Sequence, residues 1–344
     1  MVCVAAFIIL VLIGIFVAVI SIFKRDFGKR YLKALKKAFY CFGKKVRLQK
    51  CDTNFSDDVK SLLLRKIILK KPKLVKPLSI TIEIASVFLV ILTVWSIIEA
   101  AKAGLSLWVF GTCNISQPSN CALGADSCGL DEDNLNWFTE WGEIFSNLPD
   151  RFRNWHVADY SDLNLAFTTG NVSSDNLALS IIDPGCSVCL QSYKNLQESP
   201  DFLEKHQLRV VLYPIRNTNG ELRFANSELI SRIILATNQF TGTDEYSAKI
   251  INRIFTEYDE DGTIYQSLFN NSLSEAEAAQ LLTSWLAEWG IKVEDIASIT
   301  ILSISDEITN KLNHNTEIIN SQIKLKGIPT MVYDGKKHLG LFKN

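Results

Sequence analysis

Two long runs of apolar residues near the start of the 344-residue chain constrain its fold more than any other feature. The first run covers residues 2–23 and contains no charged side chain. With a rise of about 1.5 Å per residue, a helix of this length crosses a hydrocarbon core of about 30 Å. A secretory signal is the alternative, but it has a basic amino-terminal region and a small-residue cleavage site, and neither is visible. The run therefore predicts an uncleaved transmembrane helix over residues 1–23.

The second apolar run, residues 78–98, carries one charge, Glu83, close enough to its start for the carboxylate to reach the membrane interface. We expect a transmembrane helix and its exit over 78–110. Between the two runs, residues 24–77 hold 18 Lys and Arg against four Asp, a net charge of +14. Short basic loops stay in the cytoplasm, which predicts a two-pass protein of the cell membrane with an extracytoplasmic carboxy-terminal part. The loop suits contact with the anionic lipid bilayer, and we expect no nucleic-acid partner.

Residues 111–160 are predicted to be a cysteine-containing linker followed by an amphipathic helix. The linker is dense in Gly, Ser, Asn and Pro, and it lies on the side of the membrane where disulfides persist. It holds three cysteines, for which we expect one local disulfide and one odd thiol, since a zinc site would lack a fourth ligand nearby: Cys113, Cys121 and Cys128. Apolar residues recur at helical spacing over 131–148, and this face would pack on the domain or lie on the membrane surface.

The remaining residues, 161–344, alternate between strand and helix patterns, which is typical of an α/β domain. A long helical stretch over about 227–320 interrupts the alternation. The chain then predicts a hairpin with Asp334 and Gly335 at its turn. The other predicted elements are strands at 163–167, 177–183 and 208–215 and a helix from about 186 to 206.

The sequence DPGCSVC, residues 183–189, places Cys186 and Cys189 where a predicted strand ends and a helix begins. Unpaired N–H groups and the helix dipole at such a position stabilise a thiolate. We therefore expect Cys186, nearer the helix end and more exposed, to be the nucleophile, and Cys189, covered by the turn above it, to resolve the mixed disulfide. Half of a zinc site, a permanent structural disulfide and two inert buried thiols are the alternatives.

The cysteine motif and the later sequence KGIPTMVYDGKKHLG, residues 326–340, together resemble the thioredoxin superfamily. The form of the motif and the separation of the two stretches are similar to the DsbA-like extracytoplasmic branch, in which a helical insertion interrupts the thioredoxin-like α/β fold. The resemblance covers about 163–342. It implies that Pro329 is cis and lies against the cysteines, with Ile328, Pro329 and Thr330 as substrate-binding residues. An extended substrate would pair with the backbone of Ile328.

Two departures from the family pattern concern the acid and the last helix. Many relatives have an acid six residues before the nucleophile, where this chain has Ser180, so that Asp183, water or another group must move the proton. The family's final helix is also missing after the last predicted strand, so that either another segment, such as residues 131–148, covers that face or the sheet is left partly open.

The resemblance implies a thiol–disulfide oxidoreductase with a redox-active disulfide between Cys186 and Cys189, and the two apolar runs outside it predict that this enzyme is membrane-anchored. Its expected partners are cysteine-containing exported proteins and a membrane or extracytoplasmic redox partner, with no cofactor and no metal. Two other classes are open: a non-enzymatic binding or assembly module on a thioredoxin scaffold, and a copper- or zinc-handling protein that uses the same cysteines.

Overall fold

The computed structural model describes residue 36, residue 40 and residues 75–116, 128–130 and 135–343. The predicted transmembrane helix at 1–23 and almost all of the basic loop at 24–77 lie outside the described residues. The chain divides into two compact units, Met1–Ala101 and Lys102–Asn344. The unit that begins at Lys102 contains the cysteines of interest.

Among the described residues, one helix is long and apolar enough to cross a membrane, namely α4, Val75–Phe110. The mean hydropathy of its most apolar 18-residue window is 2.2, and most of its apolar side chains there are exposed. This helix covers the second predicted span, 78–110, and its length and composition agree with that prediction.

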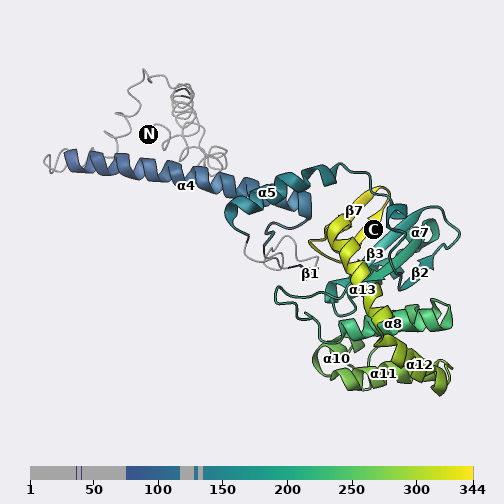
Figure 1. Cartoon of the computed structure of the whole chain (residues 1–344). Helices are drawn as coiled ribbons and strands as arrows, with labels where there is room; N and C mark the ends of the chain where they lie inside the picture. The colour runs from purple at the N-terminus through teal and green to yellow at the C-terminus, as the bar shows by residue number, and fades with distance from the viewer. Residues whose placement is uncertain (1–35, 37–39, 41–74, 117–127, 131–134, 344) are drawn as a thin grey trace, which may run out of the picture. The chain divides into compact units, whose positions relative to one another are not determined.

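A five-stranded mixed sheet forms the centre of the second unit, in the order β2-β4-β3-β6-β7 (Figure 1). The two central strands β3 and β4 are parallel, and every other neighbouring pair is antiparallel. Strand β3 is buried along most of its length, as expected for a central strand that helices cover on both faces. The strands are β2 Phe167–Gly170, β3 Leu177–Ile182, β4 Gln207–Leu212, β6 Thr330–Tyr333 and β7 Lys336–Leu339.

Helices α8 to α13 lie between β4 and β6 in the chain and form the predicted helical insertion. Figure 1 shows α8, α10, α11 and α12 gathered as one group, from which α13 leads back to the sheet. Buried side chains of this group belong to the same hydrophobic core as the sheet, so the insertion and the sheet are one folded body. The helices are α8 Ser227–Thr241, α9 Glu245–Thr256, α10 Tyr265–Asn271, α11 Glu275–Glu288, α12 Val293–Ser303 and α13 Asp306–Ile318, followed by the π-helical turn η5, Ile319–Ile323.

Two predicted elements differ from the structure. The strand predicted at 163–167 starts only at Phe167, because the Asn164 N–H donates to the Asn315 side chain at 2.7 Å and not to a neighbouring strand. The single helix predicted over 186–206 is two helices, α6 Ser187–Gln197 and α7 Pro200–Lys205. Pro200 has no N–H for a continuing helix and instead begins the second one.

The carboxy-terminal hairpin is confirmed. Strands β6 and β7 pair from Thr330 with Leu339 to Tyr333 with Lys336. Asp334 and Gly335 have φ values of 47° and 75°, which a two-residue turn between right-twisted strands requires.

The predicted amphipathic helix is α5, Trp137–Asn147, and the Asn136 side chain caps it by accepting from two N–H groups. Its buried Ile144 packs in a small cluster with Phe110 and Ile115. Ile144 therefore packs α5 on residues at and after the end of α4, whereas Phe138 and Phe145 of the same helix remain exposed. Two short 3₁₀ helices follow, η3 Leu148–Arg151 and η4 Val157–Tyr160.

Candidate thiol–disulfide exchange site

The cysteine motif forms a tight turn between the end of β3 and the start of α6. Asp183 follows the strand directly, and its carboxylate accepts from the N–H groups of Gly185 and Ile215, each at 2.7 Å. The Cys186 N–H donates to the Asp183 carbonyl oxygen at 3.1 Å, and Cys186 is the residue that caps α6. The predicted position of Cys186 at a helix N-terminus is therefore confirmed.

Gly185 is required by space at this turn. A Cβ atom on this residue would overlap the Phe224 side chain and would lie 2.8 Å from the Asn270 Oδ1 atom. The absence of a side chain lets the segment that carries Phe224 and helix α10 pack directly on the backbone of the cysteine motif.

Two amide side chains of α10 hold the carbonyl groups of the turn. Gln266 Nε2 donates to the carbonyl oxygens of Pro184 and Cys186, at 2.8 and 3.0 Å. Asn270 Nδ2 donates to the Gly185 carbonyl oxygen at 2.8 Å. The bonds to Pro184 and Gly185 give these carbonyl oxygens side-chain partners, and the bond to Cys186 adds to the one that its carbonyl oxygen accepts from the Leu190 N–H. The helical insertion is therefore part of the site.

Cys189 lies one helical turn after Cys186 and is a free, fully buried thiol. Burial raises its pKa well above the usual value, and the negative charge of Asp183 raises it further, while a hydrogen bond with the Asp183 backbone opposes both. Burial also raises the pKa of Asp183 to about 7, although the hydrogen bonds from the N–H groups of Ile215 and Gly185 lower this pKa. The site therefore holds an acid that titrates near neutral pH beside a thiol that resists ionisation.

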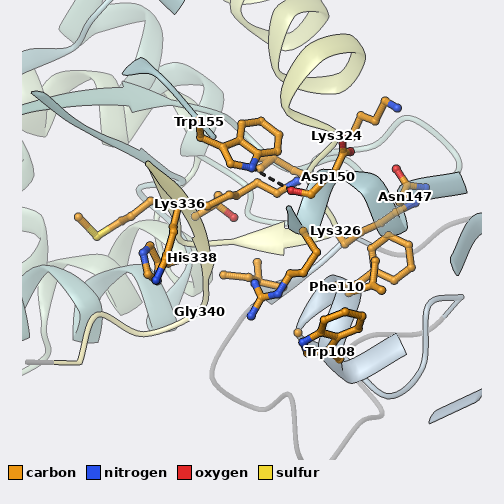
Figure 2. A pocket seen from close by; sticks show the side chains of 18 of the residues that line it. Trp108, Phe110, Asn147, Asp150, Trp155, Lys324, Lys326, Lys336, His338 and Gly340 are labelled. Carbon is orange, nitrogen blue, oxygen red and sulfur yellow. Dashed lines mark hydrogen bonds between the residues drawn. The ribbon is translucent and has the colours of Figure 1, made fainter. Parts of the chain in front are cut away.

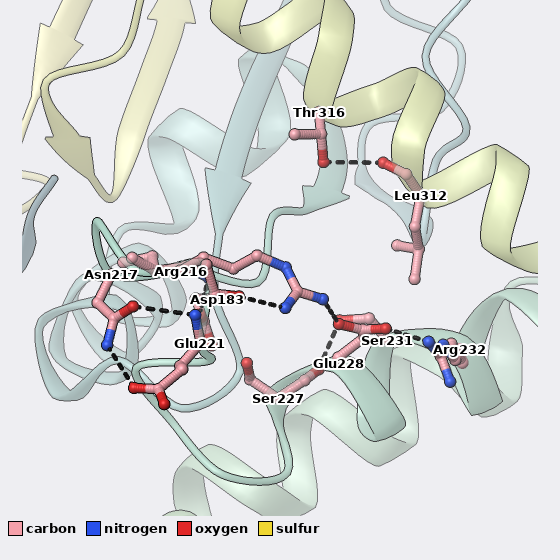
Figure 3. Close-up of polar contacts among 12 residues, drawn as sticks. Asp183, Arg216, Asn217, Glu221, Ser227, Glu228, Ser231, Arg232, Leu312 and Thr316 are labelled. Carbon is pink, nitrogen blue, oxygen red and sulfur yellow. Dashed lines mark hydrogen bonds and ion pairs between the residues drawn. The ribbon is translucent and has the colours of Figure 1, made fainter.

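Figure 3 shows that the segment after β4 closes over Asp183. Glu228 forms ion pairs with Arg216 and Arg232, and these fix the start of α8, where the buried Ser227 lies beside Asp183. Asp183 has no exposed surface as a result.

The structure joins Cys186 to Cys128 in a disulfide, across 58 residues of sequence. The expected disulfide between Cys186 and Cys189 is not the one that this structure holds. The exposure of Cys186 also differs from the expectation, because the bonded segment covers it completely. Cys113 is disulfide-bonded as well. The linker was expected to hold one local disulfide and one odd thiol; Cys128 is neither locally paired nor a free thiol, because its bond joins it to Cys186 outside the linker.

Cys128 belongs to a short strand, β1 Cys128–Gly129, which pairs with β5, Gly327–Ile328, in the antiparallel direction. Cys128 lies opposite Ile328, and Gly129 lies opposite Gly327. The Ile328–Pro329 bond that follows β5 is cis, as the resemblance implies. The backbone edge at Ile328, predicted to bind a substrate strand, is thus occupied by a strand of the chain itself.

Thr330 has a supporting position beside this edge. Its side chain is buried, and its hydroxyl donates to the Gly327 carbonyl oxygen at 2.7 Å. The Pro329 carbonyl oxygen accepts from the Gly340 N–H at 2.8 Å. These two bonds fix the loop between β5 and β6 from the side of the sheet.

Four side chains that shape the site were not assigned to it from the sequence. The amides of Gln266 and Asn270 occur four residues apart on one helix, which is a spacing that could have signalled a shared polar contact. Arg223 donates to the Gly129 carbonyl oxygen at 2.6 Å and so holds β1, a contact that no local pattern marks. Cys128 was recognised as a linker cysteine but not as a partner of Cys186.

A cavity of about 560 Å³ lies elsewhere in this unit, beside β6 and β7 (Figure 2). Trp155 Nε1 donates to the Asp150 carbonyl oxygen within it at 3.1 Å. Its lining contains no cysteine, so the cavity is not where the cysteine chemistry occurs. Many of its lining side chains are basic: Arg151, Arg153, Lys324, Lys326, Lys336, Lys337 and Lys343. Among the residues described by the structure, no group of three His, Cys, Asp or Glu side chains is placed to hold a metal ion.

No family model and no curated protein matches the sequence. Solved structures with a similar fold include a thioredoxin-like oxidoreductase from Silicibacter pomeroyi, which is 15% identical with a TM-score of 0.37 and covers 51% of this chain and 84% of its own. The thiol-disulfide exchange protein alpha-DsbA2 from Wolbachia pipientis is 14% identical with a TM-score of 0.35, covering 54% of this chain and 87% of its own. MdbA, a thiol-disulfide oxidoreductase from Corynebacterium matruchotii, is 16% identical with a TM-score of 0.36, covering 50% and 81%.

Similarities of this size carry no argument about chemistry. The sheet order, the parallel β3–β4 pair, the cis bond before β6 and the helical insertion are features of this chain's own structure. They make the fold thioredoxin-like, with the insertion that the sequence predicts.

Proposed function

We propose that the protein is a membrane-anchored thiol–disulfide oxidoreductase that acts on cysteines of exported proteins through Cys186 and Cys189. The observation that carries this proposal is the disulfide between Cys186 and Cys128. Cys128 lies in an extended strand that pairs with the backbone beside Pro329. An exchange intermediate needs the same arrangement: a cysteine-bearing peptide added to a sheet edge, with its sulfur bonded to the catalytic cysteine.

The chemistry needs only the two cysteines of α6. The Cys186 thiolate attacks a substrate disulfide, forms a mixed disulfide and releases one substrate thiolate. Cys189 then attacks the Cys186 sulfur, a Cys186–Cys189 disulfide forms and the second substrate thiolate leaves. The substrate gains two electrons and the protein loses two, and the reverse sequence oxidises a substrate dithiol. The reduction potential of the redox partner sets the direction.

The substrate-binding residues of this proposal are Ile328, Pro329 and Thr330. Ile328 offers its backbone to a substrate strand, as it does to Cys128 in this structure. Pro329 follows Ile328 through the cis bond and has no N–H of its own to donate to the substrate strand. Thr330 holds the carbonyl oxygen of Gly327, the residue before Ile328, and so fixes the edge.

The membrane anchor of this proposal is two-pass, with the unit from Lys102 onward outside the cytoplasm. The apolar helix α4 and the net charge of +14 over residues 24–77 support it. An extracytoplasmic position would also suit a protein in which Cys113, Cys128 and Cys186 are oxidised. The redox partner would then lie in the same membrane or in the space outside it.

Reduction of insulin disulfides by the full chain in detergent tests the activity. Cys186→Ser removes the only sulfur that the proposal brings to a substrate, and we expect the rate to fall to that of the buffer reductant alone. Cys51→Ser, a change in the basic loop, is the matched control and should leave the rate unchanged. A Cys186→Ser variant that keeps its activity would show that the cysteine motif is structural.

A further inference from the structure

The strand β1 binds the exchange site through more than its disulfide. The Leu130 N–H donates to the Lys326 carbonyl oxygen at 3.1 Å, which continues the pairing of β1 with β5 by one residue. From the opposite side, Arg223 Nη1 donates to the Gly129 carbonyl oxygen. Cys128 itself is buried within the main core. A two-residue strand with these contacts has a built position at the site, independent of the sulfur–sulfur bond.

The three cysteines at the site differ in surroundings. Cys186 lies between the other two, bonded to Cys128 on the edge side and one helical turn from Cys189 on the core side. Cys189 remains a thiol in this arrangement. Cys186 can therefore form a disulfide with either of two partners, Cys128 or Cys189, and the remaining cysteine is then a thiol.

We propose that Cys128 is a third cysteine of the exchange reaction: a second resolving thiol, carried on a strand that occupies the substrate edge when Cys128 and Cys186 are bonded. The inference rests on the proposed function, since it assumes that Cys186 exchanges with substrates. It adds a reactant that the Cys-x-x-Cys motif alone does not supply. It also identifies the Cys128–Leu130 segment as an internal competitor of substrate peptides.

The steps balance without any other reactant. When a substrate peptide is bonded to Cys186, the Cys128 thiolate attacks the Cys186 sulfur. A Cys128–Cys186 bond forms, the bond to the peptide breaks, and the electron pair leaves on the peptide thiolate, which takes a proton from water. Alternatively, the Cys189 thiolate attacks the Cys128–Cys186 disulfide, a Cys186–Cys189 bond forms and Cys128 leaves as a thiolate. This second step oxidises and reduces nothing overall, so the two disulfide forms interconvert by themselves.

The surroundings of each thiol favour Cys128 in resolution. Cys189 is sealed in the core next to Asp183, and burial raises its pKa, so its thiolate is scarce. Cys128 approaches from the same edge as the substrate, on a strand of the same chain. Because Cys128 belongs to the same chain, its attack is intramolecular and does not depend on the concentration of free peptide.

The experiment measures how many peptide thiols the reduced full chain releases from the symmetric disulfide of a single-cysteine peptide. One equivalent appears when the peptide is attached to Cys186, and a second appears only when another cysteine resolves it. The background chain has the five cysteines outside the site, Cys3, Cys41, Cys51, Cys113 and Cys121, replaced by Ser, and mass spectrometry after acid quenching locates the attached peptide.

We expect Cys189→Ser and Cys128→Ser each to release two equivalents, because the remaining cysteine resolves the intermediate. In the Cys189→Ser chain the product should be the Cys128–Cys186 disulfide. The Cys128→Ser, Cys189→Ser double variant should release one equivalent and keep the peptide on Cys186. Circular dichroism of each variant, with Cys128→Ala as a second substitution, checks that the change has not unfolded the site.

A Cys189→Ser chain that traps the peptide as fully as the double variant would overturn the proposal, because Cys128 would then resolve nothing. The proposal would also be overturned if the oxidised wild-type protein contained no disulfide between Cys128 and Cys186. This measurement needs no variant. Failure of the proposed function looks different: Cys186→Ser would still release thiols, or wild-type protein would release none.

Discussion

The two cysteines of α6 are one helical turn apart, yet they face different parts of the molecule. Cys186 caps the helix and is bonded to a strand that a few hydrogen bonds hold at the β5 edge. In the bonded state both sulfurs are buried in the same core, but Cys189 is a free thiol next to a buried carboxyl group. The sulfur of Cys186 thus lies at the β5 edge, which the short strand β1 can leave. The sulfur of Cys189 lies on the other side, where a strand cannot reach it.

The packing around each cysteine explains this difference. On the edge side, two residues of pairing, the bond from the Leu130 N–H to Lys326 and the bond from Arg223 hold β1. On the core side, amides of α10 hold the backbone of the turn, and Gly185 packs directly against Phe224. A substrate can reach the Cys186 sulfur once β1 has left the edge. The Cys189 thiol, in contrast, must form its thiolate inside a close-packed interior.

The largest expected effect concerns Asp183, the acid on the core side. Its pKa is about 7 in the folded protein, against 3.8 as its ordinary value, so the folded state binds the extra proton between these pH values. Stability from this group is therefore complete below about pH 4 and is lost as the pH rises through 7. The change corresponds to a loss on the order of 4 kcal/mol in the free energy of unfolding.

Other carboxyl groups titrate as well, so the measurement is a difference between wild type and Asp183→Asn. Chemical denaturation of the full chain at several pH values gives the two free energies. We expect the free energy of unfolding of wild type, relative to that of the variant, to fall between pH 4 and pH 8. The variant also loses one acceptor for the N–H groups of Gly185 and Ile215, which changes its stability at every pH. A difference that stays constant with pH would mean that Asp183 is not held in the core as its contacts indicate.

A smaller effect is expected at Gly185, where the core side meets the turn. Gly185→Ala forces a Cβ atom into Phe224, and overpacking of this kind costs about 1–3 kcal/mol. Gly142→Ala is the matched control in α5, where a Cβ atom meets nothing within 4 Å. The control should raise the free energy of unfolding by about 0.5–1 kcal/mol because alanine favours a helix. Equal effects of the two substitutions would show that the turn is loosely packed.

Local patterns predicted the elements that meet at the site. The strand–turn–helix at the cysteine motif follows from an apolar run, a proline and a glycine, and the hairpin follows from Asp334 and Gly335. The helical insertion was predicted from the long stretch of helical pattern over about 227–320. The break of α6 from α7 was also readable, since Pro200 cannot continue a helix, but the apolar pattern on both sides concealed it.

Contacts between distant segments could not be predicted in the same way. The bond between Cys128 and Cys186 joins residues 58 apart, and several cysteines of the outer part could each have been its partner. The donation from Gln266 to Cys186 depends on how the insertion folds back on the turn, which periodicity does not encode. The sequence therefore predicted the residues of the motif but not the strand that covers it or the helix that holds it.

The rate of alkylation at each cysteine, measured against pH, tests the difference between Cys186 and Cys189 most directly. The full chain is reduced, treated briefly with iodoacetamide, and read site by site by mass spectrometry. The account predicts that Cys186 reacts first, with a thiol pKa below the value of about 8.5 for free cysteine, because it caps α6. Cys189 should react slowly, with a pKa above that value, because it is buried beside Asp183. Equal rates at the two sulfurs, or faster reaction at Cys189, would contradict the account.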